Sequence, residues 1–101
     1  PEHESVMAGL RSHIAQAEFD KETVDNVTSI LNSYLVSQQP TVQKPEALVA
    51  GYWRFLQDHE LIDGPMLAPK DLSEKFGVSS STILKRSKEF GAYFEELLAK
   101  K

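Results

Sequence analysis

Apolar positions recur along the chain at helical spacing, and nowhere do apolar and polar residues alternate long enough to predict a strand. Val6, Leu10 and Ile14 lie four residues apart, as one face of an amphipathic helix requires. A second apolar stripe follows Asp20, a residue type that favours helix N-caps. It consists of Val24, Val27, Ile30, Leu31, Tyr34 and Leu35. The N-terminal part of the chain therefore predicts two amphipathic helices.

The segment that begins at Pro45 has a different pattern, because it is apolar on nearly all sides. Residues 47–56 include a single charged side chain, Arg54. A helix that is apolar around its circumference is typical of the middle of a bundle. Gly51 within it costs roughly 1 kcal/mol relative to alanine, so we expect it to allow close approach of a neighbouring helix. The sequence thus predicts a buried third helix.

Three aromatic residues crowd this third helix. Tyr52, Trp53 and Phe55 are too close in sequence to share one helical face. We therefore expect one of them to reach the surface or a groove, either beneath the loop before Lys70 or at a partner site.

Two shorter helices are predicted between Pro69 and Phe90, joined by a tight turn. Pro69 suits a first helical position. Gly77 can adopt the left-handed conformation that ends a helix. Ser73, four residues before Gly77, is small enough to let the two helices cross. This arrangement indicates a helix-turn-helix within about residues 69–90.

The second half of this motif has the expected structural residues. Val78 would fill the corner, and Ser79 is a good N-cap with Thr82 at the third helical position. Ile83 lies six residues after Gly77, where such motifs return an apolar side chain to the core.

A longer stretch extends the comparison beyond this motif. The segments PEALVAGYWRFLQ and LAPKDLSEKFGVSSSTILKRSKEF resemble the cyclin-like repeat of transcription factor TFIIB and its archaeal relatives, from Val42 to Phe90. They also resemble bacterial domains of unassigned function. The chain has one repeat instead of two and lacks the family's zinc ribbon, so a general initiation factor is not expected. The resemblance implies an all-α fold: a single five- or six-helix cyclin-like bundle with a buried central third helix and a C-terminal helix-turn-helix.

Length and composition fit one soluble domain. The 101 residues are 41% hydrophobic and 26% charged. We expect a single domain over 1–101 and, because the sequence begins with Pro1, one excised from a longer protein. No apolar run approaches the roughly 20 residues that cross a bilayer, and we expect no signal peptide, since the chain does not open with an apolar stretch of that type. A cytoplasmic or nucleoid-associated location, or a nuclear one in a eukaryote, is the expectation.

Charge is unevenly distributed. The net charge is −4, with four basic residues against ten acidic ones in residues 1–66, and seven against five in residues 67–101. A local positive excess around the helix-turn-helix favours contact with a phosphate backbone.

The resemblance implies that the last helix can enter a major groove of double-stranded DNA. Early residues of such helices read base edges. At matching positions these are Ser80, Ser81, Thr82 and Lys85. Arg86 and Lys88 would lie toward the phosphates, as would Lys70 on the preceding helix. Arg86 departs from many repressors, which place an apolar residue there.

Two functions remain open at this point. One is a DNA-binding domain with a role in transcription regulation, and the other is a cyclin-like protein–protein interaction module in which the basic helix is only a solvated face. A stripe beyond Gly91 would close the core or form a homodimer seam, with the helix either bent or broken at Gly91. It consists of Tyr93, Phe94, Leu97 and Leu98.

Catalytic chemistry is not indicated. The chain has no cysteine, and His3, His13 and His59 lack metal-ligand spacing. No phosphate-binding loop or nucleophile elbow occurs. We expect no enzyme activity, no metal and no cofactor.

Overall fold

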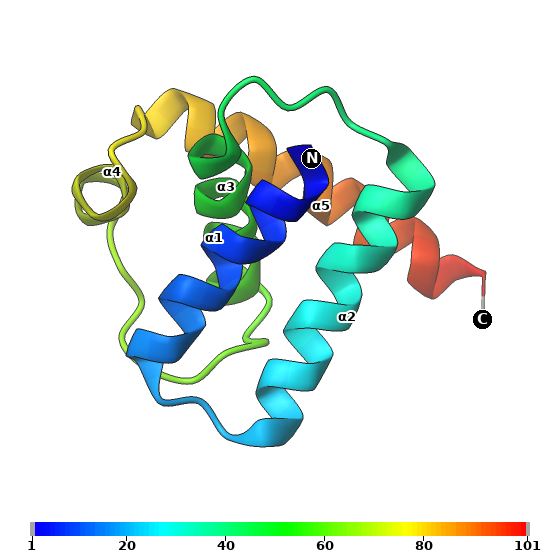
Figure 1. The fold of residues 1–101 in the computed structure, drawn as a ribbon, viewed down its shortest axis with the longest axis horizontal. Helices are drawn as coiled ribbons and strands as arrows, with labels where there is room; N and C mark the ends of the chain where they lie inside the picture. Colours follow the sequence, from blue (N-terminus) through cyan, green and yellow to red (C-terminus); the bar gives the residue numbers. More distant parts are fainter. Residues whose placement is uncertain (1, 101) are drawn as a thin grey trace.

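The fold is built from five helices. The computed structural model describes residues 2–100 and contains no strand among them. The helices are α1 (Glu2–Ala17), α2 (Lys21–Gln38), α3 (Pro45–Asp58), α4 (Pro69–Phe76) and α5 (Ser80–Ala99), arranged as Figure 1 shows. The all-α prediction is confirmed. Gly91 does not break the last helix, since α5 continues through it to Ala99, so the bundle has five helices rather than six.

Helix α3 occupies the centre of the bundle, as its apolar circumference predicted. In Figure 1 α1 and α5 lie on different sides of it, with α4 at its edge. Eight of its apolar positions and the side chain of Gln57 are buried. The Gln57 amide exchanges two hydrogen bonds with the backbone of Leu67, in the loop that leads to α4. That pairing satisfies a buried polar group and ties the loop to the core.

The expectation that one aromatic residue of α3 reaches the surface is wrong. Tyr52, Trp53 and Phe55 are all buried. Tyr52 and Phe55 pack against Phe90 of α5, whereas Trp53 packs against Phe76 of α4. The sequence argument assumed that a helix buries one face, but α3 has neighbours on several sides, and the charged Arg54 and Asp58, not the aromatic residues, take the side that reaches solvent.

Gly51 is the point of closest approach between α3 and α5, which confirms its predicted role. A Cβ at this position would overlap the Cβ of Arg86 and lie 3.1 Å from the backbone of both Arg86 and Ser87. A side chain here would push the two helices apart.

Helix α5 starts at the same end of the bundle as α3. The ring centroids of Phe55 and Phe90 are 5.9 Å apart, and those of His59 and Phe94 are 5.5 Å apart. The second pair lies four residues after the first on both α3 and α5. Since the contacts advance in the same direction along both helices, α3 and α5 cross while running in the same general direction. Their N-terminal ends therefore lie at the same end of the molecule.

No helix among residues 2–100 combines the length and apolarity that crossing a membrane would need. Over the same residues, no cluster of three or more histidine, aspartate or glutamate side chains is placed to hold a metal ion.

Candidate nucleic-acid interface

The corner between α4 and α5 has the predicted backbone geometry. Gly77 is left-handed with φ 66°, and its N–H donates to the carbonyl oxygen of Ser73 at 2.9 Å. The N–H of Val78 donates to the same carbonyl at 3.3 Å. A Cβ at Gly77 would meet no atom within 4 Å, so the positive φ, not lack of space, favours glycine.

Ser79 caps α5, as predicted. Its Oγ accepts a hydrogen bond from the backbone N–H of Thr82 at 3.3 Å and lies 2.9 Å from the Thr82 hydroxyl. Ile83 is buried, and Val78 is half-buried against the core. The cap and these two apolar contacts fix the direction in which α5 leaves the corner.

The first turns of α5 are open to solvent. Ser80, Ser81 and Lys85 are exposed, whereas Thr82 is half-buried and its hydroxyl is hydrogen-bonded to the cap. The Ser80 hydroxyl lies 3.5 Å from the carbonyl oxygen of Pro69, the first residue of α4. The N-terminal turns of α4 and α5 therefore lie side by side.

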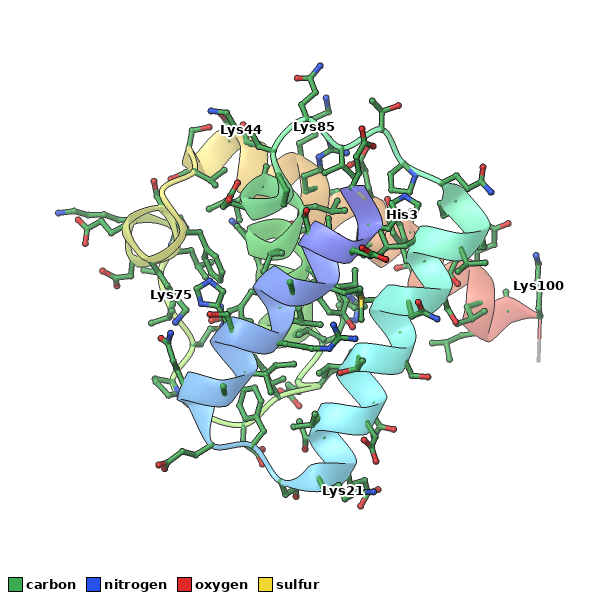
Figure 2. The ribbon with its side chains drawn as sticks, viewed as in Figure 1. His3, Lys21, Lys44, Lys75, Lys85 and Lys100 are labelled. Atoms are coloured by element: carbon green, nitrogen blue, oxygen red, sulfur yellow. The ribbon has the colours of Figure 1, made fainter. Side chains whose placement is uncertain are left out.

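Basic side chains from three elements gather around this tip. Lys70 is exposed in the first turn of α4, and Lys85 is exposed on α5. Lys44 directly precedes α3, whose start lies at the same end of the bundle as the start of α5. Figure 2 shows Lys44 and Lys85 at this end, with Lys21 at the opposite end. We call Lys44, Lys70 and Lys85 the basic tip.

Lys44 was missed by sequence reasoning. It lies outside the helix-turn-helix, in a short connection that contains no local sign of binding. Only the shared direction of α3 and α5 brings it to the tip. A long-range contact of this kind leaves no signal in a single sequence.

The basic tip has an acidic neighbour. Gly9 faces Val49, and the rings of His13 and Trp53 are 6.0 Å apart, so α1 also runs in the direction of α3. Helix α1 therefore begins at this end as well, and its first turn carries acidic side chains, Glu2 and Glu4. The positive surface is thus limited to the side of α3 where α4 and α5 lie.

Arg86 lies at the crossing of α3 and α5 rather than at the tip. Its side chain is 24% exposed, and its guanidinium pairs with Glu89 at 3.1 Å. The carbon stem of an arginine can cover apolar surface while the charge stays near water. Because Gly51 leaves room beneath it, an arginine fits where many helix-turn-helix proteins place an apolar side chain.

Lys88 lies on the flank of α5. It lines a shallow groove of about 410 Å³ between α5 and the end of α3, together with Asp58, His59 and Glu95. Two carboxylates thus share its surroundings, and it is more than two turns from Ser79 along the helix.

Comparison with known proteins finds a distant relative. The Uncharacterized protein YccF of Bacillus subtilis (strain 168) is 27% identical over 89 residues, which cover 88% of this chain and 25% of YccF. The chain thus spans about a quarter of that protein's length. No protein-family model matches the chain, and no solved structure matches it.

Proposed function

We propose that this domain binds double-stranded DNA through the helix-turn-helix formed by α4 and α5. The observation that carries the proposal is the basic tip, where Lys44, Lys70 and Lys85 from three separate elements surround the exposed start of one helix. Separate cations that converge on one end are suited to successive phosphates of a duplex.

The residues divide by the part of DNA that they would meet. The exposed side chains of Ser80, Ser81 and Lys85 are placed to meet base edges, because the first turns of such helices enter the major groove. Thr82 is less available, since its side chain is half-buried and its hydroxyl is hydrogen-bonded to the cap at 2.9 Å. Lys70 and Lys44 would contact phosphates, which orient a protein without reading sequence.

Two further predicted phosphate contacts lie farther from the tip. Arg86 would have to exchange Glu89 for a phosphate, and Lys88 would have to turn away from the groove on the flank of α5. With three cations at the tip and a net charge of −4, one copy of the domain should bind weakly and with a strong dependence on salt.

Salt-dependent binding to random duplex DNA tests the proposal. Fluorescence anisotropy should detect binding at low ionic strength, and Lys44→Ala or Lys70→Ala should each reduce the slope of log K against log salt by about one unit. Lys85→Ala should in addition change the preference among duplex sequences.

Lys21→Ala is the matched control, since it removes the same charge from an exposed lysine at the opposite end of the molecule. An equal loss for Lys21→Ala and Lys44→Ala would show that only net charge matters. Absence of salt-sensitive binding at low ionic strength would leave the motif a structural corner.

An interaction module remains the second candidate, and one observation favours it. Leu97 and Leu98 are exposed on the last turns of α5, beyond the buried part of that helix. Trp53, the other site considered for a partner, is buried. A partner surface would therefore lie on the C-terminal half of α5.

A further inference from the structure

An unpartnered stripe runs along the flank of α5. Leu84, Lys88, Gly91, Glu95 and Leu98 follow one another at spacings of four, three, four and three residues, so they lie on one side of the helix. Leu84 is 37% exposed and Leu98 is 51% exposed. We call these five positions the α5 flank.

The α5 flank is hollowed as well as exposed. The groove of about 410 Å³ beside it is lined by Leu84, Lys88, Gly91 and Glu95, and by Asp58 and His59 at the end of α3. Its wall also includes the uncharged Ser87 and Ala92, so apolar and charged side chains both line it.

The order of residues along the α5 flank is complementary to itself when reversed. We propose that two copies of the chain associate through this flank, with the two α5 helices antiparallel and Gly91 at the two-fold axis. Leu84 of one copy then meets Leu98 of the other, and the reverse contact repeats at the far end. Lys88 of one copy then lies near the level of Glu95 of the other, so that each cation faces a carboxylate across the contact, whereas Asp58 is already paired with Arg54 of its own chain at 3.5 Å.

This arrangement gives a reason for Gly91, whereas no contact among residues 2–100 requires a glycine there. A Cβ at Gly91 would meet only the Nε2 of His59, at 3.9 Å, which is ordinary contact. Its backbone is helical, so a left-handed conformation is not required either. A glycine in a helix costs roughly 1 kcal/mol relative to alanine. Close approach of a second helix at the two-fold axis gives a physical reason for a residue without a side chain there.

Charge complementarity favours a second copy of this chain as the partner that covers the α5 flank. A general amphipathic partner would require only the leucines, whereas the reversed order of Lys88 and Glu95 about Gly91 matches this same chain. The contact covers a few turns of one helix, which is less than the 1,200–2,000 Å² or so of a standard stable interface. The dimer should therefore be weak and depend on concentration.

The arrangement has a consequence for DNA binding, which rests on the proposed function. With α5 rising 1.5 Å per residue, the starts of the two α5 helices would be about 33 Å apart. Paired helix-turn-helix units read half-sites roughly 34 Å apart. The test of association needs no DNA, so its outcome is independent of DNA binding.

Sedimentation velocity of the whole chain over a wide concentration range tests the dimer. The wild type should shift from monomer to dimer as concentration rises. Lys88→Glu and Glu95→Lys should each weaken association by roughly tenfold, because each puts like charges at two symmetric places. The double variant Lys88→Glu/Glu95→Lys should restore it. Lys85→Glu, with the same charge change on the same helix but off the flank, should associate like the wild type.

Engineered cysteines test the antiparallel register, since the chain has none of its own. Gly91→Cys should form a disulfide-linked dimer on mild oxidation. Leu98→Cys alone should not, but a mixture of Leu84→Cys and Leu98→Cys should cross-link between the two variants. A monomer at every concentration, a charge reversal that the double variant fails to rescue, or cross-linking of Leu98→Cys to itself would each overturn the proposal.

Discussion

Helices α3 and α5 carry similar apolar residues but have opposite surroundings. Helix α3 has packed neighbours on most of its circumference, so even its three aromatic residues are buried. Helix α5 has only three buried residues, Ile83, Ser87 and Phe90, and its first turns, flank and last turns are exposed. Helix α3 thus holds the bundle together, whereas α5 uses one face for stability and leaves its other faces exposed.

Truncating a leucine should give the largest difference in stability between a variant of α3 and a variant of α5. Leu48 is buried on α3, whereas Leu98 is exposed on α5. Leu48→Ala should lower the free energy of unfolding by about 2–5 kcal/mol through lost burial and a cavity. Leu98→Ala should change it by no more than about 0.5 kcal/mol. Urea denaturation at low protein concentration measures both, and similar losses would contradict the contrast.

Replacing Gly51 or Gly91 by alanine should change the free energy of unfolding in opposite directions. Gly51→Ala forces a methyl group against the backbone of α5 and should destabilise the fold by about 1–3 kcal/mol or more. Gly91→Ala meets only ordinary contact and should stabilise the monomer by up to about 1 kcal/mol, because alanine favours the helix. Thermal unfolding of dilute samples distinguishes them, and a shift of both in one direction would refute the assigned packing.

The cap of α5 should have a smaller, local effect. Ser79→Ala removes the acceptor for the Thr82 N–H and should lower the free energy of unfolding by about 1 kcal/mol. Ser79→Asp keeps an acceptor at the same place and is the matched control. Amide hydrogen exchange should show faster exchange in the first turn of α5 for the alanine variant only. Equally faster amide exchange across the whole bundle would show that the effect of the cap is not confined to the first turn of α5.

The smallest expected effect is a dependence on pH at the joint of α1, α3 and α4. The His13 ring lies 4.4 Å from that of Phe76, and its Nδ1 is buried without a hydrogen-bond partner. Burial, and secondly the charge of Lys75, lower the pKa of His13 below the ordinary 6.5.

Since the unfolded chain then binds a proton more readily, His13 favours folding above pH 6.5, and this contribution is lost as pH falls through the lowered pKa. Urea titrations between pH 7 and pH 5 should show a shallower decline for His13→Gln than for the wild type. Parallel declines would assign the pH dependence to other groups.

Local signals in the sequence determined much of this protein. The helical stripes, the cap at Ser79 and the left-handed corner at Gly77 follow from spacing and backbone chemistry within a few residues. The role of Gly51 could also be predicted, because close approach of another helix is one of the few physical reasons for a glycine within a strongly apolar helix. The stripes, the cap and the corner are set by residues that are neighbours along the chain, whereas the partner of Gly51 is a distant segment.

Only the tertiary structure decided the rest. Packing on several sides hides all the aromatic residues of α3, and the crossing at Gly51 places Arg86 against α3. The common direction of α3 and α5 brings Lys44 to the basic tip. Phe90 and Phe94, packed against Phe55 on either side of Gly91, hold α5 as one helix through it. These outcomes depend on which helices meet, and contacts between distant segments are not encoded by the period of any one of them.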